Sequence, residues 1–239
     1  MGTSGWSYDW NPDGLEWYVS SSGLNAVELN ASFYRFPRAS TVRRWSRVGE
    51  GIRWAVKVHR GVTHTRRLSR SSLDLWERFR DLFSLMDHLI DFYLFQMPPG
   101  FSRTPENEER VEAFAAESGL GPRMALEFRH VSWFSEDVEE WARRLDVTLV
   151  SVDAPDLPRT LFNTTGLIYL RMHGRTWWYA HRYTPDELAE VARALSAARA
   201  KAIYVFFNND HDMLDNGRAM LTLLGGELRG QRTLDLDWR

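Results

Sequence analysis

The chain of 239 residues contains no cysteine. This absence excludes disulfides, thiolate metal sites, iron–sulfur clusters and a cysteine nucleophile, so any metal would need His, Asp, Glu or Asn ligands. Long apolar runs are missing as well, because the longest, Ala202–Phe207, is far shorter than the ~20 residues of a membrane span. No basic segment followed by an apolar one opens the sequence. These absences predict a cytoplasmic protein with no membrane segment.

Excess charge of either sign is also absent, since the formal net charge is −2 at pH 7. A value so near neutral argues against a histone-like binder of polyanions, although it leaves room for a local basic patch. Lysine is scarce: of 30 cationic side chains, two are lysines, Lys57 and Lys201, and the other 28 are arginines. Because arginine and lysine differ in geometry and in how readily their charge is tuned, each lysine is informative.

Short segments of β type alternate with helix-like segments along the whole sequence, with no linker between them. Eight such repeats predict a parallel sheet and one α/β domain over residues 1–239, a single (β/α)8 TIM-like barrel. A doubly wound open sheet is the alternative, but no G-x-G-x-x-G turn follows any segment. The expected strands are Met1–Gly5, Ala26–Ala31, Arg53–Val58, Phe92–Met97, Met124–Phe128, Thr148–Val152, Leu167–Met172 and Ile203–Phe207. The clearest expected helices are Ser71–His88, Pro105–Ser118, Ser135–Leu145 and Pro185–Ala200, the last with a capping box of Thr184 and Glu187.

Polar side chains recur at alternate positions of these strands and just beyond their ends. Since alternate residues point to opposite faces, an apolar face packed under the helices would turn the polar set into the barrel and toward its C-terminal rim. Barrel enzymes keep their active sites at that rim. Six of the seven histidines also fall at or after the C-terminal end of an expected strand. The polar set comprises Glu28, Asn30, Lys57, His59, Gln96, Glu127, Arg129, Ser151, Asp153, Arg171, His173, Asn208, Asn209 and Asp210.

Each of these features also has an interpretation without chemistry. The inward charged residues would then form a ladder of buried ion pairs that only fills the barrel, although such pairs add little stability beyond that of apolar packing. Single histidines such as His59 and His173 would be satisfied core residues. The arginine-rich segment 59–70 is either a solvated loop or a phosphate clamp. The run Trp177–Tyr179 is a lid or stacking platform, or a loop packed on its own barrel. The four residues of the ladder would be Glu28, Lys57, Glu127 and Arg171.

Seven motifs occur in order along the chain: GTSGWSY (2–8), ELNASFYR (28–35), WAVKVHR (54–60), FQMPPGF (95–101), ALEFRHVSW (125–133), YLRMHGRTWWY (169–179) and YVFFNND (204–210). Together they resemble the YecE-like family, known as domain of unknown function 72, from the first residue to about Leu224. The resemblance implies a TIM-barrel fold, a bacterial or archaeal cytoplasmic protein and no established reaction. Such barrels are similar in fold to endonuclease-IV-like barrels, which is analogy only. The family's recurrent polar positions also include His64, His130 and Gly174.

Two classes of function fit these residues. In the first, the chain is an enzyme acting on a small anionic, phosphate-bearing substrate, with Glu127 or His173 for acid–base work and Lys57 as a point charge or an amine of lowered pKa. Its reaction would be of the hydrolase or the lyase/isomerase class. In the second, the chain binds or processes nucleic acid, with the segment 60–70 on phosphates and Trp177–Tyr179 on bases. The number of ionisable groups on one rim disfavours a non-catalytic scaffold.

The remaining roles follow from the first class. Glu28 and Asp153 are further catalytic candidates, and an anion clamp is expected from three arginines, Arg129, Arg171 and Arg175. A divalent metal is an option that the sequence does not require, because no His-x-x-x-His spacing occurs. Its ligands would be Glu127, Asp153, His173 and Asp210. No pattern indicates the oligomeric state. The residues expected to contact substrate are Asn30, His59, His64, Gln96, Arg129, Arg171, Arg175, Trp177, Tyr179, Asn208, Asn209 and Asp210.

The scarcity of lysine generates a prediction for Lys57. A position that needed only positive charge would be expected to hold arginine in this chain, so lysine indicates either a need for a compact ammonium or an amine of tunable pKa. If space decides, Lys57→Met folds at least as stably as the parent, while Lys57→Arg loses ~1–3 kcal/mol through overpacking. If chemistry decides, both variants fold and both lose ligand binding or turnover. Thermal unfolding and ligand titration separate the two, and a Lys57→Arg variant that keeps stability and binding would remove Lys57 from the site.

Overall fold

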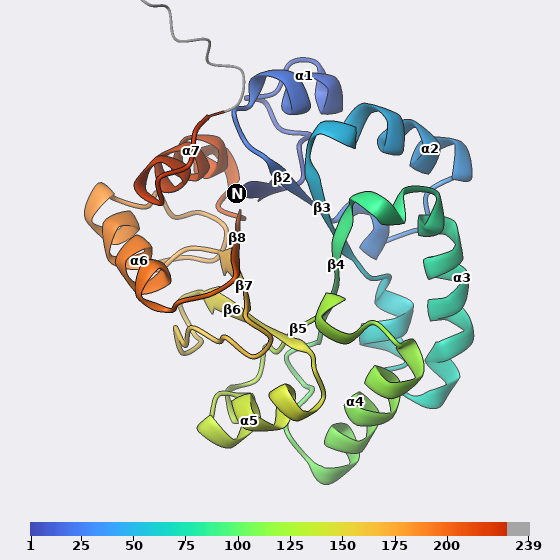
Figure 1. Ribbon diagram of the computed structural model, residues 1–239. Helices are drawn as coiled ribbons and strands as arrows, with labels where there is room; N and C mark the ends of the chain where they lie inside the picture. Colours follow the sequence, from blue (N-terminus) through green and yellow to red (C-terminus); the bar gives the residue numbers. More distant parts are fainter. Residues whose placement is uncertain (229–239) are drawn as a thin grey trace, which may run out of the picture.

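Eight parallel strands close into one barrel in the computed structural model, which describes residues 1–228 (Figure 1). Each strand pairs with the next along the chain, and β8 pairs with β1 to complete the ring, with Gly2 beside Phe206. The predicted α/β barrel and its eight strands are therefore confirmed. The strands are β1 Gly2–Ser4, β2 Ala26–Leu29, β3 Arg53–Lys57, β4 Ile90–Gln96, β5 Met124–Glu127, β6 Thr148–Asp153, β7 Leu167–Met172 and β8 Ala202–Phe207.

Seven α-helices surround this ring within residues 1–228 (Figure 1). The capping box of Thr184 and Glu187 opens α6 as predicted, but this helix ends at Ala197, before Arg199 adopts a left-handed backbone conformation. The expected helix Ser71–His88 is shorter and continues as a 3-10 helix, Ser84–Leu89, across a kink at Met86. None of these helices has the length and apolar character needed to span a membrane. The helices are α1 Gly14–Ser21, α2 Ala39–Val48, α3 Leu73–Phe83, α4 Pro105–Ser118, α5 Glu136–Arg144, α6 Pro185–Ala197 and α7 Met213–Leu223.

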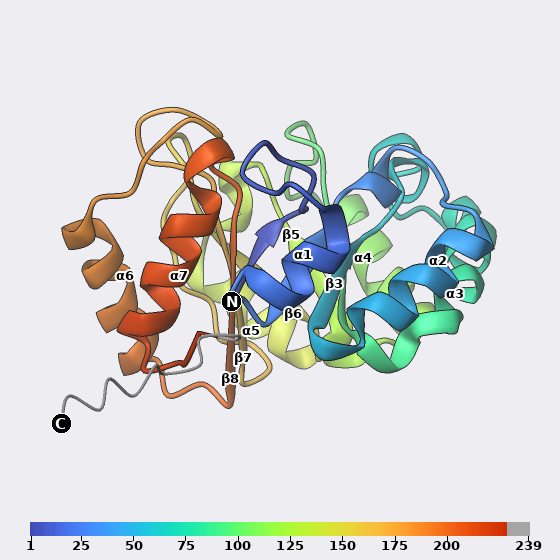
Figure 2. The ribbon, with the colours of Figure 1, turned by 90° about the horizontal axis from the view of Figure 1, so that it is seen from above.

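Two apolar cores lie on the two sides of the barrel wall. The larger core fills the space between the strands and the helices, and a smaller one fills the lower part of the barrel interior. The segments that follow the strands gather on one side of the molecule, the upper side in Figure 2. The polar layer that holds Glu28, Glu127 and Arg171 lies between the interior core and these segments. The interior core consists of Ala26, Ala55, Phe92, Leu94, Ala125, Val150, Tyr169 and Phe206.

The inward orientation predicted for Ser151 and Asp153 is wrong. In β6, Val150 lies beside the inward Tyr169 and Asp153 lies beside the outward Met172, so Ser151 and Asp153 face the helices. The assumption that the apolar face packs under the helices fails here because both faces of a parallel barrel strand are buried. Valine gains as much from the interior core as from the outer one.

The close approach of β1 to β2 at Gly2 generates a prediction. A side-chain carbon at Gly2 would overlap the backbone carbonyl of Ala26, which cannot move without breaking the strand pairing. We expect Gly2→Ala to lower the free energy of unfolding by ~1–3 kcal/mol. The matched control is Gly100→Ala, because no atom lies within 4 Å of its added carbon. Urea unfolding of both variants is the measurement, and equal stabilities would contradict this account of the closure.

Candidate functional site

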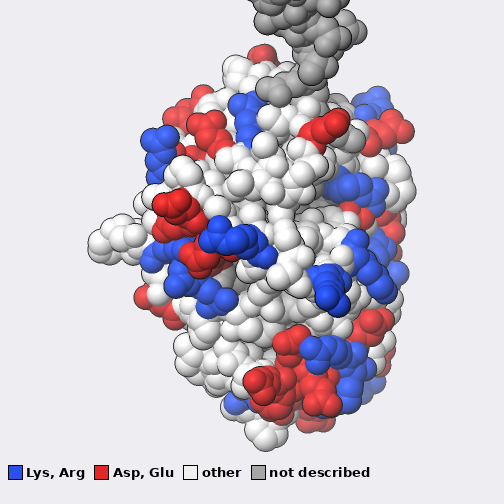
Figure 3. All heavy atoms as spheres, turned by 60° about the vertical axis from the view of Figure 1, so that its left-hand side comes forward, with Lys and Arg blue, Asp and Glu red and all other residues white. Residues whose placement is uncertain are grey.

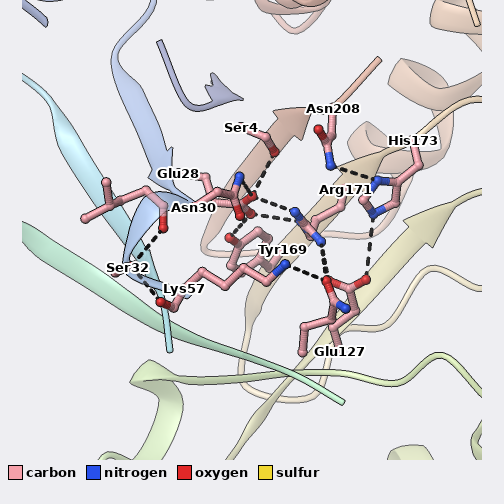
Figure 4. A network of polar contacts seen from close by, with 12 residues as sticks. Ser4, Glu28, Asn30, Ser32, Lys57, Glu127, Tyr169, Arg171, His173 and Asn208 are labelled. Atoms are coloured by element: carbon pink, nitrogen blue, oxygen red, sulfur yellow. Dashed lines mark hydrogen bonds and ion pairs between the residues drawn. The ribbon is translucent and has the colours of Figure 1, made fainter. Parts of the chain in front are cut away.

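Arg171 occupies the centre of the polar layer, where two carboxylates hold its guanidinium (Figure 4). Its Nε lies 2.9 Å from Glu28 Oε2, its Nη2 lies 2.6 Å from Glu28 Oε1, and its Nη1 lies 2.6 Å from Glu127 Oε2. Arg171 is 1% exposed and both carboxylates are fully buried. The inward placement predicted for these three residues and Lys57 is confirmed. The three strands β2, β5 and β7 are thereby joined through one side chain.

Glu28 receives further donors from β1, from β7 and from the residue that follows β2. The hydroxyl of Ser4 donates at 2.7 Å, that of Tyr169 at 2.5 Å, and the amide of Asn30 at 3.1 Å. Burial alone would raise the pKa of Glu28, but the charge and hydrogen bonds of Arg171, with those of Tyr169 and Ser4, outweigh burial and lower it. Glu28 is therefore ionised at neutral pH and its oxygens are occupied, as expected for a residue that holds Arg171 in place.

Glu127 and His173 form the other side of the network. Glu127 accepts from Arg129 Nε as well as from Arg171, and these two guanidiniums hold its pKa well below the usual range against the effect of burial. Burial, then the charges of Arg129 and Arg171, lower the pKa of His173 to about 3. Its Nε2 lies 3.0 Å from Arg129 Nη2, and its Nδ1 lies 3.2 Å from the side-chain amide nitrogen Nδ2 of Asn208, so both ring nitrogens face donors. Neither predicted acid–base residue exchanges protons near neutral pH.

Lys57 ends β3 at the edge of this network. Its Nζ donates to Gln96 Oε1 at 2.8 Å and lies 4.3 Å from the centre of the Phe33 ring. Within residues 1–228 its ammonium forms no ion pair with a carboxylate. Burial, followed by the charge of Arg171, lowers the pKa of Lys57 to about 7, although Glu127 and Glu28 act in the opposite direction. Lys57 is thus the member of the network whose protonation changes near neutral pH.

His64 stands beside Lys57 on the segment that follows β3. Its ring packs edge-on against Phe33 at 4.9 Å, and its Nδ1 lies 3.0 Å from Thr63 Oγ1. Burial lowers the pKa of His64 to about 4, and the charges of Lys57 and Arg129 lower it in the same direction. The charges of Lys57 and Arg129 therefore oppose protonation of His64, and all three side chains are only partly buried.

Trp178 covers the other side of the mouth. Its ring lies 4.6 Å from the Arg129 guanidinium and 5.3 Å from the ring of His173, and its Nε1 donates to Asp156 at 2.9 Å. Tyr179 also packs on His173, at 5.4 Å. Trp177, which the sequence favoured, is 70% exposed and contacts neither group. A run of three aromatic residues in a loop carries no periodic signal that tells which ring turns inward.

Several predicted site residues lie elsewhere. Asp153, on the outer face of β6, accepts from Arg175 at 3.0 Å and from Tyr183 at 3.1 Å, and Arg175 also pairs with Glu190 at 2.9 Å. The structure therefore does not assemble the expected clamp of three arginines, since Arg171 and Arg175 are each held between two carboxylates. His59 packs on Phe36, Asn209 is buried against His181 and Asn216, and Asp210 is half exposed beside His211. 

The predicted metal ligands do not converge. Within residues 1–228 no three His, Asp or Glu side chains are grouped so that they could hold a metal ion, and the side chain of Asp153 is bound by Arg175 and Tyr183 instead. The residues of this site that the sequence analysis did not single out are Ser4, Phe33 and Tyr169. Strand alternation could have found Tyr169, two positions before Arg171, and Ser4, which pairs with Glu28 across β1 and β2.

Comparisons with known proteins agree on one family. A family model described as "Protein of unknown function DUF72" matches residues 1–235. The UPF0759 protein YunF of Bacillus subtilis is 30% identical over 255 residues, which cover 91% of this chain and 89% of that protein. A DUF72 family protein of Thermotoga maritima, solved by crystallography, superposes with a TM-score of 0.82 at 26% identity over 94% of this chain and 99% of its own. A DUF72 family protein of Enterococcus faecalis gives 0.84 at 22% identity, over 97% and 98%.

The buried neutral His173 generates a prediction about acid stability. Its pKa is about 3 in the folded chain and ~6.5 in the unfolded chain, so the unfolded chain binds more protons between these values and stability falls as pH falls. One such group contributes a slope of up to ~1.4 kcal/mol per pH unit. Glu28 and Glu127, whose pKa values are lowered, add their losses only further down, below ~4.5.

We expect His173→Asn to flatten the decline of the free energy of unfolding between pH ~6 and ~5. The matched control is the exposed His211, whose pKa is raised by its hydrogen bond to Asp9. The stability contributed by His211 is fully present below its unfolded pKa of ~6.5, so His211→Asn leaves the slope between pH ~6 and ~5 nearly unchanged. Urea unfolding at the two pH values measures both effects, and an unchanged slope in His173→Asn would contradict a neutral His173.

Proposed function

The chain belongs to the DUF72 protein family, and we propose that it is an enzyme that binds a small anionic substrate at the carboxyl ends of its barrel strands, beside Lys57. The observation that carries the proposal is the missing counterion of this lysine. Glu28 and Glu127 balance the charges of Arg171 and Arg129, so no carboxylate of the network remains to pair with the Lys57 ammonium. An anionic group of the substrate would supply the partner that residues 1–228 do not.

Arg129 supports the same conclusion. Its Nε binds Glu127 and its Nη2 binds His173, while its Nη1 has no hydrogen-bond partner within residues 1–228. The ring of Trp178 lies over the guanidinium and fixes its plane. An anion between Lys57 and Arg129 would meet two cationic donors. The two repel each other when no ligand is present.

Proton transfer is the chemistry that Lys57 suits. A general acid or base works best when its pKa lies near the working pH, and the pKa of Lys57 is about 7. Glu127 stays ionised and His173 stays neutral at that pH, so they orient Arg171, Arg129 and Asn208. In this proposal Lys57 transfers the proton, and the network of Glu127, His173 and Arg171 positions it.

Nucleic-acid binding is the second candidate, and the exposed rings of Trp177 and Tyr179 favour it. A polyanion also needs a broad basic surface. The face that carries α6 and α7 does not offer one, because Figure 3 shows Lys and Arg side chains interspersed with Asp and Glu. Lys57, whose ammonium has no carboxylate partner within residues 1–228, matches one small anion better than it matches a polyanion. Oligonucleotide binding that weakens steeply with salt would favour the second candidate.

Sulfate titration tests the proposed site, because sulfate keeps its charge across the pH range of interest. Binding of an anion favours the ammonium form of Lys57, so affinity is full below pH ~7 and falls above it by up to about tenfold per pH unit. We expect calorimetry or thermal shift to detect millimolar sulfate or phosphate with this pH dependence. Lys57→Met removes the binding, and Lys201→Met, at an exposed lysine, leaves it intact. Equal binding by Lys57→Met would contradict the proposal.

A further inference from the structure

We propose that Lys57 forms a covalent imine with a small carbonyl compound that carries an acidic group. The inference rests on the anion site proposed above and names the class of substrate that the site takes. It follows from the position of the amine, from what surrounds it and from what the neighbouring arginine offers.

The amine of Lys57 is available to react because its hydrogen-bond partner is uncharged. Lys57 ends β3 and points toward Arg171 and Glu127 (Figure 4). Within residues 1–228 its Nζ has one hydrogen-bond acceptor, the neutral amide oxygen of Gln96 at 2.8 Å. A carboxylate in that place would keep the lysine protonated and unreactive. With a neutral acceptor, the nitrogen can lose its third proton and direct its lone pair toward a ligand.

The surroundings of Lys57 Nζ favour the uncharged amine. The Phe33 ring, 4.3 Å from Nζ, excludes water on one side, and the guanidiniums of Arg171 and Arg129 repel a positive charge. Burial beside other cations is the arrangement that activates lysine as a nucleophile. Because the pKa of Lys57 is about 7, a large fraction of the side chain is a free amine at neutral pH.

Arg129 offers a binding position for the acidic group of the substrate. The Nη1 of Arg129 is the guanidinium nitrogen of this network without a partner in residues 1–228, and Trp178 holds the group from behind. A carboxylate or phosphate bound there would hold the carbonyl of the same molecule near Lys57. A 2-oxo acid or a phosphorylated ketone has the required pair of groups.

The proposed reaction balances without an oxidant or reductant. The Nζ–C bond forms, the C–O bond breaks, and the two hydrogens of the amine leave with the oxygen as water. A proton taken up from solvent gives the protonated imine, whose positive charge Glu127 and Glu28 favour while Arg171 and Arg129 oppose it. An imine also draws electrons from the adjacent carbon, as lysine-dependent barrel chemistry requires. Arginine cannot form this bond under the same conditions, which agrees with a lysine at position 57 in a chain that has only two.

Borohydride trapping tests the imine. The purified chain is incubated with pyruvate, glyoxylate or dihydroxyacetone phosphate near pH 7, reduced with sodium borohydride, and examined by intact mass and peptide mapping. Lys201 is exposed and serves as an internal comparison, and mapping separates both lysines from the terminal amine. We expect an acidic probe to label Lys57 at least about tenfold more than Lys201, and more than uncharged acetone does.

Two variants sharpen the test. Gln96→Glu keeps the size of the side chain and gives Lys57 a carboxylate partner, which raises its pKa. Labelling at pH 7 is then expected to fall about tenfold or more, since an opposite charge at this range shifts a pKa by ~1–3 units. Lys201→Met leaves the labelling of Lys57 unchanged. Circular dichroism of each variant verifies that the barrel is folded.

The outcomes separate the imine from the anion site. If no acidic probe labels Lys57 but the probes still compete with sulfate, the imine is wrong and the anion site stands. If the probes neither label Lys57 nor compete with sulfate, both proposals are wrong. Labelling of Lys57 and Lys201 to equal extent, or equal labelling by acetone, overturns the selective site.

Discussion

The pairing of Arg171 with two buried carboxylates is the interaction on which the upper half of this barrel depends. Glu28 binds the guanidinium through two oxygens and Glu127 binds its remaining nitrogen, so β2, β5 and β7 are tied together above the interior core. Removal of one partner would leave an uncompensated charge in a dry environment, which is far more costly than the pair itself is stabilising. The network therefore behaves as one rigid unit, and it fixes the positions of the side chains that are bonded to it.

The state of Lys57 follows from that unit. Because the two carboxylates are fully engaged by Arg171 and Arg129, they are not available to pair with the lysine, whose acceptor is an amide instead. The same guanidiniums keep His173 neutral and Glu127 ionised. Among these groups, Glu28 and Glu127 stay ionised, His173 stays neutral and Lys57 titrates near neutral pH. Buried pairs gain little stability over apolar packing, so this division favours a functional network over a ladder that merely fills space.

The sequence was informative where the two faces of a strand differ strongly. In β2, β5 and β7 the charged residues alternate with aliphatic ones, and Glu28, Glu127 and Arg171 lie inside the barrel as predicted. In β6 the contrast is weaker because valines alternate with a serine and an aspartate, and both faces find an apolar core. Asp153 consequently belongs to a separate cluster with Arg175 and Tyr183.

The sequence by itself determined the barrel, the order of its strands and most of the inward residues, because these depend on periods of two and on the alternation of strands with helices along the chain. Only the tertiary structure decided which charges neutralise one another. Glu28 and Arg171 are 143 residues apart, and no local pattern relates them. It likewise decided that Trp178, and not Trp177, covers Arg129. The lack of a counterion at Lys57 is such a result, since an unpaired charge is defined by what every other strand brings to the same place.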